Sequence, residues 1–275
     1  PIIKAKIKTA KPRITITAFP GTNCEYDSAK RFELAGGIPN IFVVRNITPS
    51  ALSESIEGLA SSIDNSQILM LPGGFSAGDE PEGSGKFIAT FLRNPRIAES
   101  VMNLINKRDG LILGICNGFQ ALVKLGLLPY GEIRNISESD PTLTFNQIGR
   151  HVSTMVRTKI ISDLSPWFNK TEAGDVHIIP VSHGEGRFIA DKEHFEKMKI
   201  NGQIATQYVD FNGMPSNDIL FNPNGSFEAV EGITSPDGRI LGKMGHSERI
   251  GINLYKNIPG NKDQMLFESG IEYFL

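Results

Sequence analysis

The segment that most constrains the fold runs from residue 111 to residue 124. Residues 111–115 are apolar, as in a buried strand, and they lead into a helix-compatible stretch through Gly114-Ile115-Cys116-Asn117-Gly118. The glycines two residues before and two residues after Cys116 allow the backbone to turn sharply without side-chain collisions. The pattern predicts a nucleophile elbow with sulfur in place of oxygen, which presents the Cys116 thiol at the carboxyl end of a sheet.

The rest of the first half fits an α/β fold. We predict strands at residues 14–19, 40–44, 68–71 and 111–115, which are apolar and bounded by Gly, Pro or Asn. Apolar residues at helical spacing predict a helix that ends at Gly36-Gly37 and another that begins at Asn94-Pro95. Strands that alternate with helices indicate a parallel sheet flanked by helices.

The second half is richer in β-structure. Extended runs occupy residues 151–161, 176–181, 203–209, 227–233 and 239–244. Turn sequences such as Pro236-Asp237-Gly238 separate them, which favours a mixed or antiparallel extension of the sheet. We therefore predict one α/β domain over residues 13–275 with a β-rich extension. The basic residues 1–12 are predicted to be a linker from an upstream domain.

Composition excludes several classes of protein. Lys and Arg number 28 and Asp and Glu 30, which leaves a formal charge of −2 and no basic field for nucleic acid. The longest apolar runs fall far below the roughly 20 residues of a membrane span. Two cysteines are too few for a disulfide scaffold and fit a reducing cytosol. We expect a cytoplasmic protein.

The two cysteines differ in context. A thiolate is the reactive form of cysteine, and a helix N-terminus or a neighbouring imidazole lowers a thiol pKa from its free value of about 8.5. An isolated cysteine is usually structural, but the bracketing glycines and the strand-to-helix context favour Cys116 as a nucleophile. Cys24 has no such bracket. It lies where the first helix is predicted to start, and we expect it to be structural and dispensable.

A thiol nucleophile needs a base and a group that orients the base. Of the five histidines, His151, His177 and His194 lie in predicted strands or a charged helical stretch, contexts typical of surface or core roles. Two histidines remain as candidates for the base.

His246 and His183 each precede a glutamate by two residues. In an extended segment, residues i and i+2 project to the same side, so Glu248 is placed to hold the His246 ring. His183 has the same spacing to Glu185 but lies in a Gly-rich loop, which is more typical of a binding surface. Spacing alone does not choose between the two histidines.

A thioester route also needs donors for an oxyanion. Pro72-Gly73-Gly74-Phe75 follows a predicted strand, and its backbone amides are placed to point toward a pocket at the sheet edge. The amide of Asn117 would be a second donor. Alone, Pro-Gly-Gly is an ordinary turn.

Several motifs together resemble those of the class I glutamine amidotransferases, and within them the glutaminase domain of phosphoribosylformylglycinamidine synthase. These motifs occupy residues 21–25, 72–76, 114–120, 182–187 and 246–249. The resemblance implies that Cys116 is the nucleophile, His246 the base and Glu248 its orienting carboxylate. It further implies an oxyanion hole and glutamine pocket made by Gly73, Gly74, Phe75, Asn117, Gln120, Ser182, His183, Gly184 and Glu185, and no metal site.

One departure concerns the segment that carries His246. The family usually reads Pro-His-Pro-Glu-Arg there, whereas Gly245 and Ser247 replace both prolines in this chain. We expect the loop to be less rigid for that reason.

The resemblance implies that glutamine is hydrolysed to glutamate through a thioester and that ammonia passes to a synthetase. That synthetase, in the same polypeptide or a separate subunit, would convert formylglycinamide ribonucleotide to formylglycinamidine ribonucleotide in purine biosynthesis. ATP and magnesium are expected there, and no cofactor in this chain, because Gly83-Ser84-Gly85-Lys86 does not complete a phosphate loop. The alternatives are the glutaminase of another amidotransferase and a noncatalytic binding domain of the same fold.

Because nothing in the sequence binds a nucleotide, we expect glutamine hydrolysis to be controlled through a surface that faces the synthetase. The candidates are Arg187, the loop around Glu185 and residues 76–86, which are glycine-rich and charged. The isolated chain is then expected to hydrolyse glutamine slowly.

Overall fold

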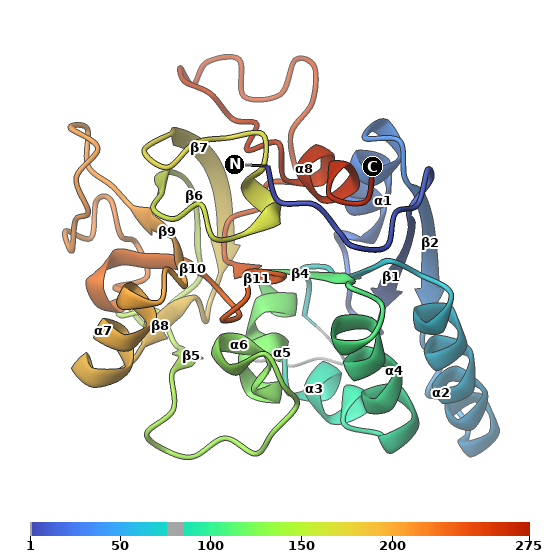
Figure 1. Ribbon diagram of the computed structural model, residues 1–275. Coiled ribbons are helices and arrows are strands. Elements are labelled where there is room, and N and C mark those ends of the chain that lie inside the picture. The colour runs from blue at the N-terminus through green and yellow to red at the C-terminus, as the bar shows by residue number, and fades with distance from the viewer. Residues whose placement is uncertain (1, 76–84) are drawn as a thin grey trace.

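The computed structural model describes residues 2–75 and 85–275. Its centre is a nine-stranded mixed sheet in the order β2-β1-β3-β4-β11-β10-β9-β6-β7. Helices α1 and α8 lie on one face of this sheet, and α3, α4 and α5 lie on the other (Figure 1). Most of the gating candidate 76–86 lies outside the described residues.

The parallel half of the sheet matches the sequence prediction closely. Its strands are β1 (Arg13–Ala18), β2 (Ile38–Val43), β3 (Ile68–Leu71) and β4 (Leu111–Ile115). The pairs β1–β2, β1–β3 and β3–β4 are all parallel. Every residue of β3 and β4 is buried, as expected for central strands covered on both faces.

The helices of the first half are α1 (Glu25–Leu34), α2 (Pro49–Asp64), α3 (Lys86–Leu92), α4 (Pro95–Asn106), α5 (Asn117–Leu125) and the short α6 (Leu127–Tyr130). Helix α4 begins where Asn94-Pro95 predicted, because the Asn94 side chain accepts a hydrogen bond from the Arg96 amide. Among the described residues, no helix is long and apolar enough to cross a membrane.

The β-rich half continues the same sheet. Its strands are β6 (Val152–Ile160), β7 (Val176–His183), β9 (Ile204–Tyr208), β10 (Val230–Thr234) and β11 (Ile240–Lys243). Strand β11 pairs with β10 in antiparallel fashion and with β4 in parallel fashion, so it joins the two halves. The run predicted from residue 227 starts as a 3₁₀ turn, η3 (Phe227–Ala229), before β10 begins.

Smaller elements complete the fold. Strands β5 (Thr142–Thr144) and β8 (Arg187–Ile189) form a separate antiparallel pair that the sequence pattern did not predict. The remaining helices are η2 (Pro166–Phe168), α7 (Lys192–Ile200) and α8 (Leu266–Glu272). Helix α7 confirms the charged helical stretch around His194.

The N-terminal segment packs against the domain. The amide of Ala5 donates to the carbonyl of Tyr273, and the amide of Lys6 donates to the Asp109 carboxylate at 2.6 Å. This segment, which we expected to be a linker, therefore contacts residues from distant parts of the chain. Its arrival from an upstream domain stays a prediction.

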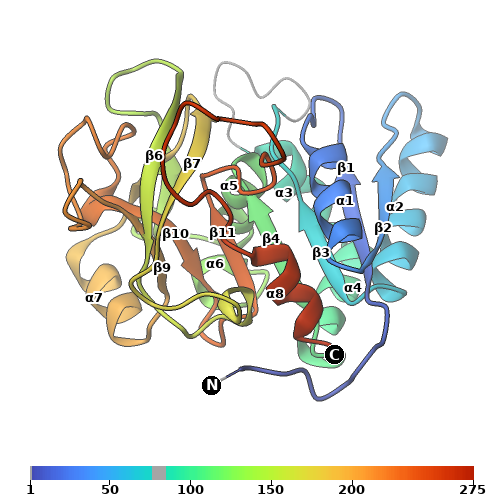
Figure 2. The same cartoon turned by 90° about the horizontal axis from the view of Figure 1, so that it is seen from above.

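Parallel pairing of β4 with β11 brings two chain segments to one sheet edge. The carboxyl ends of parallel strands meet at the same edge. The amide of Cys116 accordingly donates to the carbonyl of Lys243 at 2.8 Å, so the residues after β4 lie beside those after β11. Strands β3, β4 and β11 lie side by side in the middle of the sheet (Figure 2).

Candidate active site

Cys116 lies in the sharp turn between β4 and α5. Its backbone has φ +53° and ψ −107°, a strained conformation for a residue with a side chain. A Cβ atom at Gly118 would lie 1.9 Å from the Leu71 carbonyl oxygen, and one at Gly114 would lie 2.5 Å from Leu122 Cδ1. Both bracketing glycines are therefore required by close approach, and the predicted strand, turn and helix are present.

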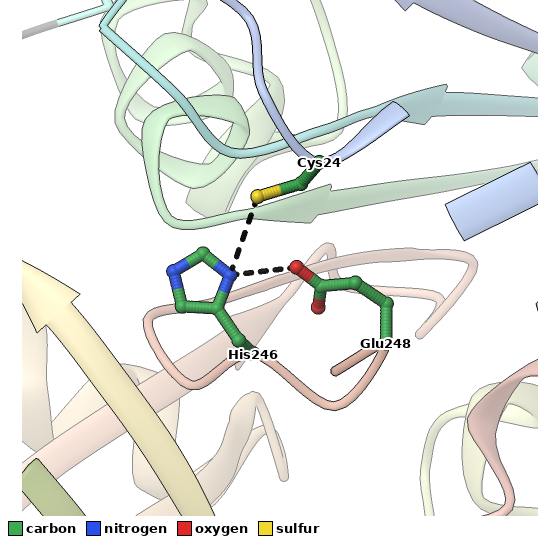
Figure 3. Close-up of side chains that lie close together, drawn as sticks. All are labelled: Cys24, His246 and Glu248. Atoms are coloured by element: carbon green, nitrogen blue, oxygen red, sulfur yellow. Dashed lines mark hydrogen bonds and ion pairs between the residues drawn. The ribbon is translucent and has the colours of Figure 1, made fainter. Parts of the chain in front are cut away.

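His246 and Glu248 lie in the loop that follows β11. The Nδ1 atom of His246 is 2.6 Å from Oε1 of Glu248, which confirms the i, i+2 geometry that the sequence indicated (Figure 3). Both side chains are buried, as is that of Cys116. The ring lies beside Gly73, where a Cβ atom would approach His246 Cε1 to 2.7 Å and Cys116 Cβ to 3.4 Å. The fold thus brings the three expected catalytic residues together.

His246 and Glu248 stabilise each other's charged forms. Burial acts to lower the pKa of His246. The charge of the Glu248 carboxylate and the hydrogen bonds that the His246 ring makes with Cys116 and Cys24 act in the opposite direction, and together they raise that pKa well above its ordinary value. Burial acts to raise the pKa of Glu248, yet the charge and hydrogen bond of His246 lower it. The His246 imidazole is therefore able to accept the proton of the Cys116 thiol, which leaves a thiolate beside an imidazolium.

Cys24 lies at the same site, where sequence reasoning did not place it. It occupies the N-cap position of α1, and its Sγ is 3.8 Å from His246 Nδ1 (Figure 3). The Arg249 guanidinium donates to this sulfur at 3.1 Å. Burial raises the pKa of the Cys24 thiol. The sequence did contain a signal for this position: the motif at residues 21–25 follows β1, and β1 ends at the same sheet edge as β4.

The Cys24, His246 and Glu248 side chains also offer three potential metal ligands, whose atoms lie within 4.8 Å of one another. However, two ligands of one tetrahedral zinc ion lie about 3.3 Å apart. The 2.6 Å between Nδ1 and Oε1 is instead the length of a charge-assisted hydrogen bond. The geometry therefore fits proton chemistry at His246 better than a preformed metal site.

His183 is set apart from the triad. Its ring is buried, and its Nδ1 donates to the Asn146 side chain at 3.1 Å, since the Asn146 amide nitrogen already donates to backbone carbonyls. Burial, with repulsion from His246, lowers the pKa of His183 to about 3. A ring with this pKa is a poor base near neutral pH. Geometry and charge both favour His246 as the base.

The predicted glutamine-pocket residues are connected to one another. The Gln120 side chain donates to the Glu185 carbonyl at 2.6 Å and accepts from the Asn117 side chain at 2.9 Å. Asn146 holds the same loop through Gly186, whose amide donates to the Asn146 oxygen at 3.1 Å. Side-chain hydrogen bonds therefore connect the start of α5 to the loop that follows β7.

The two predicted sources of oxyanion donors, Asn117 and the Gly73-Gly74 turn, both lie next to Cys116. Asn117 is the first residue of α5, and the first intrahelical bond runs from the Gln120 amide to the Cys116 carbonyl. On the other side, the Phe75 amide donates to the Gly21 carbonyl at 2.9 Å. Gly74 has φ +149°, and a Cβ there would lie 2.6 Å from the same carbonyl oxygen. The first loop therefore fixes the Gly73-Gly74 turn.

Residues 11–274 match the CobB/CobQ-like glutamine amidotransferase domain family. The chain belongs to this glutamine amidotransferase family. Among its relatives, the phosphoribosylformylglycinamidine synthase subunit PurQ of Methanococcus maripaludis is 35% identical over 244 residues, which cover 86% of this chain and 82% of the relative. The PurQ subunit of Aquifex aeolicus is 30% identical, with 92% and 96% covered.

A solved structure has the same fold over nearly the full length of this amidotransferase. PurLQS from Thermotoga maritima superposes with a TM-score of 0.68 at 26% identity, covering 96% of this chain and 99% of the matched chain. Membership of the amidotransferase family agrees with the elbow, the buried His246–Glu248 pair and the position of Cys116. The individual roles of these residues stay predictions.

Proposed function

We propose that this amidotransferase is the glutaminase of a phosphoribosylformylglycinamidine synthase. The observation that carries the proposal is the placement of Cys116 on a strained elbow beside the buried His246–Glu248 pair. The relatives named PurQ, which are similar over most of the chain, support purine biosynthesis as the pathway. We place the protein in the cytoplasm, where the substrates of purine synthesis occur.

The first chemical step follows from the positions of the side chains. His246 takes the proton of Cys116, and the sulfur attacks the carboxamide carbon of glutamine. The resulting oxyanion accepts hydrogen bonds from the amide of Asn117 and from the Gly73-Gly74 turn. The imidazolium gives the proton to the leaving nitrogen, the carbon–nitrogen bond breaks, and ammonia departs, which leaves a thioester on Cys116.

The second step regenerates the thiol. His246 now takes a proton from water, whose oxygen attacks the thioester carbon. The carbon–sulfur bond breaks, glutamate leaves, and the proton returns to the Cys116 sulfur. Glu248 lies 2.6 Å from Nδ1 in the structure, and this hydrogen bond would keep the other ring nitrogen directed toward the reacting groups.

Glutamine recognition is assigned to the unit formed by the start of α5 and the loop after β7. We assign one wall of the pocket to Ser182 and His183 at the end of β7 and to Gly184 and Glu185 after it; the Gln120 side chain on α5 donates to the Glu185 carbonyl. The Cys116 sulfur contacts the Ser182 carbonyl oxygen at 3.7 Å, so the wall lies next to the nucleophile. His183 shapes the loop through Asn146 rather than taking part in proton transfer.

Ammonia is used by a synthetase, in the same polypeptide or as a separate subunit. The synthetase binds ATP and magnesium and converts formylglycinamide ribonucleotide to formylglycinamidine ribonucleotide. Loops from distant parts of the chain meet at the sheet edge that carries Cys116, and this edge is where we place the contact with the synthetase.

The test compares two nitrogen sources. The chain is combined with its synthetase, and formylglycinamidine ribonucleotide formation is measured with glutamine or with ammonium. Cys116→Ala is expected to lose glutamine-dependent synthesis by at least about 10³-fold and to retain ammonium-dependent synthesis. Glutamine-dependent synthesis that survives in Cys116→Ala would overturn the proposal.

A second arm tests partner control. Glutaminase turnover of the chain alone is expected to be slow and to rise when the synthetase and its substrates are added. Equal turnover in both conditions would rule out assembly of the oxyanion site by the partner.

A further inference from the structure

A fully buried ion pair lies directly beneath the loop that carries His246 and Glu248. The Lys243 ammonium, on the last residue of β11, is 3.1 Å from Oε1 of Glu231 on β10, and both side chains are 0% exposed. Neither residue belongs to a motif that the sequence analysis singled out. The pair is central in the fold and separate from the glutamine pocket.

Both members of the pair bind the loop itself. The Lys243 ammonium donates to the Gly245 carbonyl at 2.8 Å and to the Ser247 hydroxyl at 3.0 Å. The Gly245 amide donates to Oε1 of Glu231 at 2.6 Å. The ion pair thus holds the residues on either side of His246.

The network extends beyond the loop. The Ser247 hydroxyl donates to Gln264 at 2.6 Å, and the Gln264 amide contacts Thr158 on β6. The Thr206 hydroxyl donates to the other oxygen of Glu231. A network of side-chain hydrogen bonds therefore connects the loop to β6, β9, β10 and β11.

Such a network is a costly way to stabilise a fold. Desolvation of two buried charges often outweighs their attraction, and a well-packed apolar pair of similar size is frequently as stable or more stable. Here the three hydrogens of the ammonium all have partners: Glu231, Gly245 and Ser247. Because two of these three partners, Gly245 and Ser247, belong to the loop, the buried charges fix the geometry of the loop.

Prolines do not fit this arrangement. A proline at position 245 has no N–H for Glu231, and a Cβ there would lie 2.1 Å from Ile179 Cδ1. A proline at position 247 would remove the hydroxyl that Lys243 and Gln264 bind. We expected the loop to be less rigid without the two prolines. Hydrogen bonds of Gly245 and Ser247 with Glu231 and Lys243 restrain the backbone at both positions instead.

We propose that Glu231, Lys243 and Ser247 are positioning residues that set the orientation of His246 and Glu248 for glutamine hydrolysis. The inference rests on the proposed function. It differs from a purely structural role, because a structural role predicts a change in stability, whereas a positioning role predicts a loss of turnover in a protein that remains folded.

The test replaces both charges at once. Glu231→Met with Lys243→Met removes the pair without leaving a lone buried charge. We expect a cooperative thermal transition close to that of the wild type, a KM for glutamine within about twofold, and a kcat at least tenfold lower. The matched control is Arg96→Met with Asp64→Asn, which removes an ion pair on the far helices and is expected to leave kcat unchanged.

A milder variant keeps the test decisive if the double variant does not fold. Ser247→Ala removes one partner of Lys243 and is expected to lower kcat about three- to tenfold, with KM unchanged. A kcat equal to wild type in folded Ser247→Ala or in the folded double variant would overturn the inference. Absence of glutaminase in the wild type with its synthetase would instead contradict the proposed function.

Discussion

The sulfur of Cys24 lies 3.8 Å from Nδ1 of His246, the same nitrogen that contacts Glu248 at 2.6 Å. The two residues are 222 positions apart in the chain. They meet because Cys24 follows β1 and His246 follows β11, two strands whose ends reach one edge of the sheet. The imidazole is thus held by a carboxylate and contacted by a thiol.

This contact predicts a measurable role for Cys24. Burial lowers the pKa of His246, the charge of Glu248 and the hydrogen bond with Cys116 raise it, and the hydrogen bond with Cys24 raises it further. Cys24→Ala should retain glutaminase activity, with kcat lowered about three- to tenfold. The apparent pKa that His246 contributes to the rate–pH profile should move to lower pH. An unchanged profile, or complete loss of activity in a folded variant, would contradict this role.

Gly73 provides a steric test of the site. In Gly73→Ala the added methyl would lie 2.7 Å from His246 Cε1 and 3.2 Å from Cys24 Sγ, so the ring must move. We expect glutaminase kcat to fall at least about tenfold while the protein stays folded. Gly251→Ala is the control, because the nearest described atom to its Cβ would belong to Leu254, at 3.6 Å. Equal activity of the two variants would contradict the placement of Gly73.

The sequence predicted the parallel half of the fold well because its signals are local. Strands β3 and β4 have the predicted bounds, since apolar runs between turn residues encode buried strands without reference to distant residues. Helix α2 was missed although Thr48 caps it and Pro49 opens it, because its many serines weaken the apolar stripe.

The parts of the site that the sequence did not predict depend on contacts between distant segments. Cys24 approaches His246 only through the strand order of the sheet. In the sequence, Glu231 and Lys243 are two charged residues on predicted strands, with no local sign that they are buried. They are buried because β10 and β11 lie between β9 and β4 in the sheet. The elbow at Cys116 was predictable because strand, glycines and helix are contiguous.

His183 predicts a pH dependence of stability. Its pKa is about 3 in the folded protein and about 6.5 in an unfolded chain. Between these values the unfolded state binds one more proton, so the free energy of unfolding falls as pH falls below about 6.5. From pH 7.5 to pH 5.0 this residue should remove about 2 kcal/mol.

Urea unfolding at these two pH values measures the effect. His183→Asn, which keeps a donor for Asn146, should reduce the pH dependence by that amount relative to wild type. His194→Gln on the surface of α7 is the comparison and should leave the dependence as it is. A wild-type dependence in His183→Asn would show that the buried ring is not the cause.

The proposed function depends above all on Cys116 as the nucleophile that attacks the glutamine carboxamide. The most direct measurement is peptide mass spectrometry after treatment with a glutamine-mimicking diazo-ketone, with the synthetase and its substrates present. We expect one covalent adduct, on Cys116, which persists in Cys24→Ala, is absent in Cys116→Ala and is prevented by excess glutamine. An adduct on Cys24, or an adduct that survives in Cys116→Ala, would show that Cys116 is not the nucleophile.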